Sequence, residues 1–223
     1  DDHSYLDSTY SITDYQVDSL HKDYRPFLGS ICHSIPFYVC LGNHEGENDY
    51  YLTRTPPNNL AVWGTKWRKF YYPNPKPNGF YSGSNDTLYN QFHGTGPTEN
   101  YFAWTWGDAL FVVLDVYRYD CDTSAKPHGW DWTLGLPQYL WLKNTLETST
   151  SKYKFVFAHH IRGEGRGGIT NAIQDEWGGY QRIATGTLTT GSGYTFPTNR
   201  PSSEGWTKPI HQLFRDNNVN IFF

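Results

Sequence analysis

The chain has 223 residues, of which 37% are hydrophobic and 18% charged, a composition typical of a folded globular protein rather than a disordered one. The formal net charge is −4 and neither sign forms a long run, so the sequence lacks the basic footprint of a nucleic-acid binder. The longest apolar run, Ala109–Leu114, is too short to span a bilayer. Abundant Trp, Tyr, Asn, Gly and Thr favour an extracytoplasmic or secreted protein, whereas nothing in the sequence indicates an oligomeric state.

The first part of the chain has the pattern of a helix followed by a strand. Apolar residues recur at helical spacing from Ile12 to Leu28, with Ser11 as a suitable N-cap and Gly29 as the expected end. The short apolar run Phe37–Leu41 then predicts a buried strand that ends at a glycine turn. A helix that leads into a buried strand is typical of an α/β repeat.

Residues 46–100 form the first of two predicted insertions. Proline, glycine and asparagine cluster in 55–59 and again in 72–78. Between these clusters, Leu60–Tyr71 is predicted to be a helix that carries several aromatic residues on one side. Long insertions of this kind are usually lids or binding surfaces, so we expect this one to lie over the mouth of the sheet.

Regular structure is predicted again from residue 101 onwards. Two strand-like runs, Tyr101–Trp106 and Ala109–Tyr117, are joined by Gly107-Asp108 and predict a hairpin. A helix begins at Leu136-Pro137, where proline is tolerated in the first turn, and Tyr153–Ala158 is the next buried strand. The apolar face of that helix is predicted to consist of Tyr139, Leu142 and Leu146.

The end of the chain repeats the alternation of helix and strand. A second insertion is predicted over 163–207. A short helix, Pro209–Arg215, and a last strand, Asn218–Phe223, follow it. We therefore expect a single α/β domain over 1–223.

Polar side chains follow two of the predicted buried strands. Asn43, His44 and Glu45 come directly after the first strand, and His159 and His160 come after the second. Because strand ends of this kind meet at one edge of an α/β sheet, we expect them to lie side by side. Mixed nitrogen and oxygen donors suit Zn, Mn or Fe better than Ca. The alternative is a turn that uses Asn and Gly for backbone geometry.

The residues Gly42–Glu45 and Phe157–His160 resemble two motifs of the calcineurin-like metallophosphoesterase superfamily, which includes purple acid phosphatases. The family pattern runs Asp-x-His, Gly-Asp, Gly-Asn-His-Asp/Glu, a strand-end His, and Gly-His-x-His. The third and fourth motifs are present and the first is absent, while Leu213–Phe223 resembles the segment that leads into the last. The resemblance implies a sandwich of two mixed β-sheets flanked by helices, incomplete here because we expect both ends to be cut.

The resemblance also implies a dinuclear site with two divalent or trivalent metal ions, most consistent with Fe, Zn or Mn. The aspartate of the second motif, which bridges both metals, is either Asp1 or Asp2. Asn43 and His159 are then ligands of the second metal. Metal ions at such spacing lower the pKa of water for in-line attack on phosphorus.

Further roles follow from the same resemblance. His44 is the catalytic residue that protonates the leaving alkoxide or steadies the phosphoryl oxygens. Glu45 hydrogen-bonds a histidine and thereby sets its tautomer. His160 is either a substrate contact or a surface histidine. Arg162, in a glycine-rich loop, either clamps the substrate phosphate through its planar fork or is a solvated loop residue.

The expected activity is hydrolysis of a small-molecule phosphate monoester or diester. One alternative keeps the fold without activity, and another is an aromatic-rich extracellular binding module. The cysteines Cys32, Cys40 and Cys121 lack the spacing of a zinc site. Cys40 is expected to be an apolar packing residue, and pairing between Cys32 and Cys121 stays open.

Overall fold

The structure is a computed structural model of the chain, and it describes residues 12–42, 45, 47, 60–86, 96–116, 134–159, 181–182, 194–195, 207–208 and 210–223. The helices within these residues are α2 (Asp14–Cys32), α4 (Leu60–Tyr71), α6 (Gly135–Thr148) and α7 (Ile210–Asp216). The strands are β1 (Ser82–Gly83), β2 (Phe102–Trp106), β3 (Ala109–Val113), β4 (Tyr153–Phe157), β5 (Gln181–Arg182), β6 (Tyr194–Thr195) and β7 (Ile221–Phe222).

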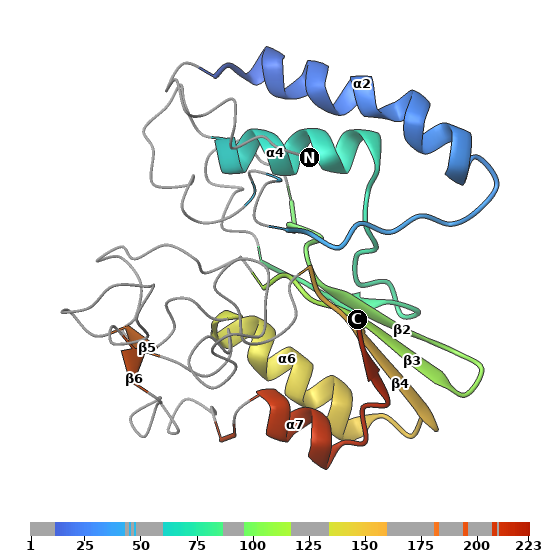
Figure 1. Cartoon of the computed structure of the whole chain (residues 1–223), viewed down its shortest axis with the longest axis vertical. Coiled ribbons are helices and arrows are strands. Elements are labelled where there is room, and N and C mark those ends of the chain that lie inside the picture. The colour runs from blue at the N-terminus through green and yellow to red at the C-terminus, as the bar shows by residue number, and fades with distance from the viewer. Residues whose placement is uncertain are drawn as a thin grey trace.

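A mixed sheet of five strands, in the order β1-β2-β3-β4-β7, forms the centre of the fold (Figure 1). β2 and β3 form the predicted antiparallel hairpin, in which Gly107 occupies the first turn position with φ +57°. β4 lies parallel to β3, and β7 lies parallel to β4. The α/β class with a mixed sheet and outer helices is therefore confirmed. β3 ends at Val113, before the predicted Tyr117.

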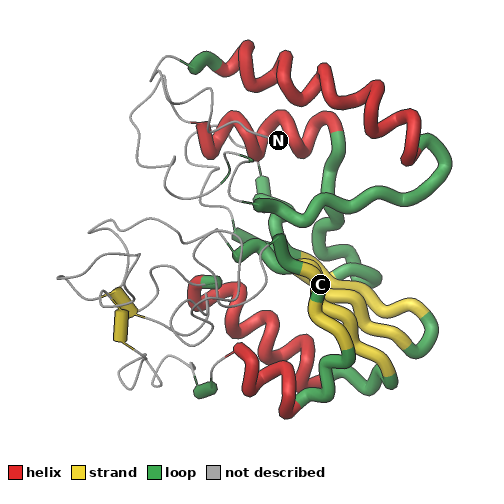
Figure 2. Tube along the Cα trace, in the orientation of Figure 1, coloured by secondary structure: helices red, strands yellow, loops and turns green. Residues whose placement is uncertain are grey.

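The main hydrophobic core lies between one face of this sheet and the helices α6 and α7 (Figures 1 and 2). Tyr139, Leu142 and Leu146 of α6 are fully buried, as the sequence predicts. The core residues of the sheet alternate with residues of the opposite face, as expected for strands with one face against helices. These core residues are Ala103, Leu110, Val112 and Val156, and α7 adds Ile210 and Leu213.

The opposite face of the sheet carries a row of aromatic side chains, which we call the aromatic face. It consists of Phe102, Trp104, Phe111, Phe155 and Phe157. The ring centroids of Trp104 and Phe111 are 5.0 Å apart, and those of Phe111 and Phe155 are 5.4 Å apart. Tyr38 packs over one end of the row, with its centroid 5.1 Å from that of Trp104. Phe102 is fully buried, whereas the other four are half-buried.

Helices α2 and α4 form a second packed unit with its own small core, visible as the upper helix pair in Figure 1. α2 begins after Thr13, whose side chain and that of Gln16 form a capping box, so the predicted N-cap Ser11 is wrong. The helix also continues through Gly29 to Cys32, past its predicted end, because Gly29 keeps a helical backbone. Asp14 accepts hydrogen bonds from two side chains of α4 and thereby ties the helices together.

The predicted strand Phe37–Leu41 is not a strand in the structure. The chain there is extended, but its backbone is held by a side chain rather than by a neighbouring strand. The N–H of Val39 donates to Oδ1 of Asn74 at 2.8 Å, and Nδ2 of Asn74 donates to the carbonyl of Val39 at 2.9 Å. The side-chain amide thus satisfies both backbone groups that a strand would have paired.

None of the helices in the described ranges is both long and apolar enough to cross a membrane. The two short strands β5 and β6 pair with each other inside the predicted insertion 163–207, apart from the five-stranded sheet.

Candidate active site

The segment that leads into the Gly42 turn lies at the carboxyl ends of β3 and β4. The thiol of Cys40 donates to the carbonyl of Leu114, just beyond β3, at 3.7 Å. Gly42 lies against the imidazole of His159, two residues beyond β4. Gly42 and His159, one from each sequence motif, therefore meet at the carboxyl ends of β3 and β4, although the first of the two predicted strands is not formed.

Gly42 lies in a place where a side chain would not fit. A Cβ atom on Gly42 would lie 2.7 Å from both Cγ and Cδ2 of His159, and 2.8 Å from Oε2 of Glu45. The carboxylate of Glu45 also accepts a hydrogen bond from the N–H of Gly42. The ring of His159 and the carboxylate of Glu45 therefore converge on the same side of Gly42.

His159 combines a fixed backbone with an exposed ring. The N–H of Ala158 donates to the carbonyl of Phe223 at 3.0 Å, which extends the pairing of β4 and β7 up to the histidine. Ala158 is buried, whereas His159 is exposed. The backbone at His159 is therefore held by the sheet, while the residue itself lies at the surface.

Cys40 is a structural neighbour of the site rather than a nucleophile. Burial raises the pKa of its thiol to about 12, and the charges of Asp115 and Glu45 act in the same direction. The thiol is therefore neutral at physiological pH, and a neutral thiol is a poor nucleophile and metal ligand. Cys32 is also a free thiol, and Cys121, the partner that the sequence left open for it, lies outside the described residues.

Asp115, at the end of β3, is held by two buried amide side chains. Nδ2 of Asn100 donates to its carboxylate at 2.7 Å. Its backbone N–H donates to Oε1 of Gln138 at 3.0 Å, and its carbonyl accepts from Nε2 of Gln138 at 2.8 Å. Gln138 therefore pairs both backbone groups of Asp115, as Asn74 pairs both backbone groups of Val39. Neither amide has a local sequence signal, since each bonds a segment distant in the chain.

A buried ion pair holds the chain beyond Glu45, at Glu47. Nε and Nη2 of Arg68, in α4, donate to the two carboxylate oxygens of Glu47 at 2.6 and 3.0 Å. The hydroxyl of Thr65 donates to the same carboxylate at 2.9 Å. Burial acts to lower the pKa of Arg68, but the nearby carboxylates, Glu47 above all, outweigh it and raise the pKa. Arginine is rarely buried, so sequence reasoning did not identify this pair.

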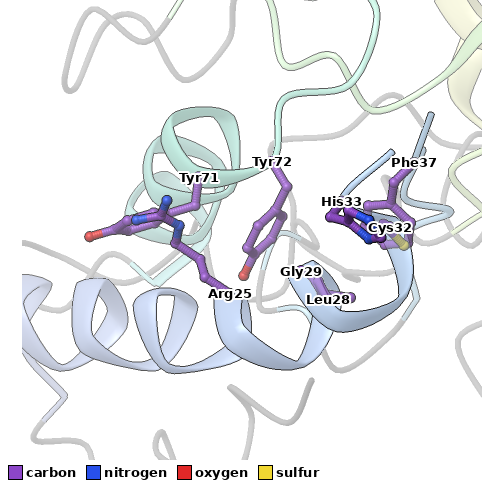
Figure 3. A pocket seen from close by; sticks show the side chains of 8 residues that line it. All are labelled: Arg25, Leu28, Gly29, Cys32, His33, Phe37, Tyr71 and Tyr72. Atoms are coloured by element: carbon purple, nitrogen blue, oxygen red, sulfur yellow. The ribbon is translucent and has the colours of Figure 1, made fainter. Parts of the chain in front are cut away.

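A hollow among the described residues lies elsewhere, between α2 and the end of α4 (Figure 3). Its volume is about 210 Å³, and Arg25 lies 5.6 Å from the ring centroid of Tyr71 on one wall. Its lining consists of Arg25, Leu28, Gly29, Cys32, His33, Phe37, Tyr71 and Tyr72. It includes none of the residues predicted for catalysis or metal binding.

Five of the predicted site residues, Asp1, Asn43, His44, His160 and Arg162, lie outside the described part of the chain, as does Asp2. Glu45 and His159 are described and lie together. Among the residues that the structure describes, no group of three His, Cys, Asp or Glu side chains is arranged to hold a metal ion.

Comparison of the chain with protein-family models, with curated proteins and with solved structures found no match.

Proposed function

We propose that the chain is a metal-dependent phosphoesterase of the calcineurin-like superfamily, which hydrolyses small-molecule phosphate monoesters or diesters. The observation that carries the proposal is the contact between Gly42 and the ring of His159, with the carboxylate of Glu45 on the same side. This contact brings together the two motifs on which the family resemblance rests.

His159, Asn43 and either Asp1 or Asp2 would hold the metals. Two bound cations, most consistent with Fe, Zn or Mn, would supply charge neutralisation and a lowered pKa of water. Glu45, beside the imidazole of His159, would restrain the orientation of the ring. His44 would give its proton to the leaving alkoxide oxygen.

Two broader expectations belong to the same proposal. The five-stranded sheet would be one half of a two-sheet sandwich, with the second sheet packed on the aromatic face. The half-buried rings of Trp104, Phe111 and Phe155 support this, since such rings gain stability when they are covered. The composition supports an extracytoplasmic or secreted location.

Metal content and hydrolysis of chromogenic phosphate esters test the proposal. We expect stoichiometric metal, together with hydrolysis of p-nitrophenyl phosphate or bis(p-nitrophenyl) phosphate. Both measurements apply to this chain and to the longest form that its gene encodes. A longest form that binds no Fe, Zn or Mn would rule the proposal out.

Three alanine substitutions separate the proposed roles. Asn43→Ala and His159→Ala should each lose bound metal, because each removes a ligand. His44→Ala should keep the metal and lower turnover by about 10²- to 10⁴-fold, the range of a positioned general acid. Equal loss of metal in all three variants would contradict these roles.

Two alternatives predict different results. A catalytically incompetent protein of the same fold would bind metal without hydrolysing either ester. An aromatic-rich binding module would bind no metal, and its support is the exposure of Phe27, Phe70 and Trp106, each about 70% accessible. Retention of the metal-free protein on a glycan surface, lost in Trp106→Ala, would favour the module.

A further inference from the structure

The chain that carries Glu45 is fixed at one point on each side of this residue. On one side, Gly42 touches the ring of His159 and its N–H donates to Glu45. On the other side, two residues beyond Glu45, the carboxylate of Glu47 is bound by the guanidinium of Arg68. The side chains of Glu47 and Arg68 are only 5% and 1% exposed, so solvent does not compete with this bond.

Arg68 also connects this chain to the end of β3. Its Nη2 donates to the backbone carbonyl of Thr98, and the hydroxyl of Thr98 donates to Oδ1 of Asn100. Asn100 in turn donates to the carboxylate of Asp115. A continuous buried set of hydrogen bonds therefore runs from Glu47 through α4 to the carboxyl end of β3.

The chain before Gly42 reaches the same strand end, because the thiol of Cys40 donates to the carbonyl of Leu114, next to Asp115, at 3.7 Å. The chain before Gly42 and the chain at Glu47 are therefore both connected to the carboxyl end of β3 by hydrogen bonds. A lysine in place of Arg68 would keep the charge but would lose the fork that bonds both oxygens of Glu47 and the carbonyl of Thr98.

We propose that Arg68 and Glu47 are positioning residues, which hold the carboxylate of Glu45 against Gly42 and the ring of His159. The consequence for metal binding rests on the proposed function, whereas the positioning itself does not. Neither residue contacts His159 in the hydrogen bonds that we describe; they act by fixing Glu47, two positions beyond Glu45.

Amide hydrogen exchange of Gly42 reports the position of Glu45 directly, because the Gly42 N–H donates to that carboxylate. We expect Arg68→Lys and Glu47→Gln each to lower the protection of Gly42 at least about tenfold relative to that of Ala158, whose N–H bonds Phe223. Leu142→Ala, on the buried face of α6, is the matched control for general destabilisation. It should lower protection at Gly42 and Ala158 together.

A titration with Mn²⁺ alone gives the second measurement. We expect Arg68→Lys and Glu47→Gln to bind Mn²⁺ about 10- to 100-fold more weakly, the usual effect of removing groups that orient metal ligands. Unchanged relative protection of Gly42 would overturn the proposed positioning. Lower protection with unchanged Mn²⁺ affinity would overturn its consequence for metal binding. If Gly42 loses protection although the wild-type protein binds no Mn²⁺, the positioning stands and the proposed function fails.

Discussion

Replacing Gly42 by alanine tests the contact that joins the two halves of the candidate site. The new Cβ would lie 2.7 Å from Cγ of His159, whereas carbon atoms in favourable contact lie about 3.5–4.0 Å apart. The ring must therefore move by about 1 Å. The backbone of Gly42 is not in the left-handed region, so the substitution acts through this contact rather than through backbone strain.

The expected cost follows from which atoms are in the way. Cγ of His159 is bonded to its own Cβ, so the ring escapes only by rotation about χ1 or by a shift of the chain after β4. Overpacking of this kind typically costs about 1–3 kcal/mol. With an m-value of about 2 kcal/mol/M in urea, a loss of 2 kcal/mol lowers the unfolding midpoint by about 1 M.

Gly29→Ala is the matched control, because it is the same chemical change in a different environment. A Cβ at Gly29 would meet no atom within 4 Å, and the residue is helical. Alanine there should stabilise the protein by about 0.5–1 kcal/mol, since glycine loses more backbone entropy on folding. Urea unfolding of both variants, followed by circular dichroism, measures the two effects.

The two substitutions are therefore expected to have opposite signs. A Gly42→Ala variant that is as stable as wild type, with its His159 ring resonances unchanged in NMR spectra, would refute the proposed contact. A stable variant with shifted His159 resonances would instead show that the ring had rotated away, and the proposed metal affinity should then fall.

Two buried titratable groups give the remaining predictions. Burial lowers the pKa of His21, whose Nδ1 lies 2.8 Å from the carbonyl of Val17, so the ring is neutral in the folded protein. In the unfolded chain, His21 takes up a proton below the ordinary histidine pKa of about 6.5, so the unfolding free energy of the wild-type protein should fall below that pH. The fall should be smaller in His21→Phe. Parallel pH profiles of the two proteins in urea unfolding would contradict this. Because the pKa of Cys40 is raised to about 12, iodoacetamide at pH 8 should alkylate Cys40 at least about tenfold more slowly than the half-buried Cys32, as measured by peptide mass spectrometry. The stability that the neutral Cys40 thiol contributes is complete below the ordinary thiol pKa and is lost as the pH rises from there towards 12. If the urea unfolding midpoints of Cys40→Ala and the wild-type protein fall equally at alkaline pH, that contribution is excluded.

Elements with strong local signals were predictable from the sequence. The helix Leu60–Tyr71 has its predicted bounds, and the hairpin turns at Gly107-Asp108 as the strand patterns indicated. The helix with buried Tyr139, Leu142 and Leu146 also follows from its periodicity. In each case the signal lies within one element, where the period of the apolar residues directly reflects which face is buried.

Predictions failed where the partner of a segment is distant in the sequence. Phe37–Leu41 has the composition of a buried strand, yet the backbone of Val39 is paired by the side chain of Asn74, 35 residues away. The predicted start of α2 was wrong for a local reason. Ser11 and Thr13 can both cap a helix, but Thr13 has a glutamine, Gln16, three positions on, which completes the capping box.

The candidate site divides in the same way. The sequence by itself determined which donors follow the predicted strands, and it placed Glu45 and His159 among them. Only the tertiary structure decided that Gly42 has no room for a side chain and that Arg68 is buried against Glu47. The physical reason is that donor chemistry is a property of each residue, whereas room and burial depend on the segments that folding brings alongside.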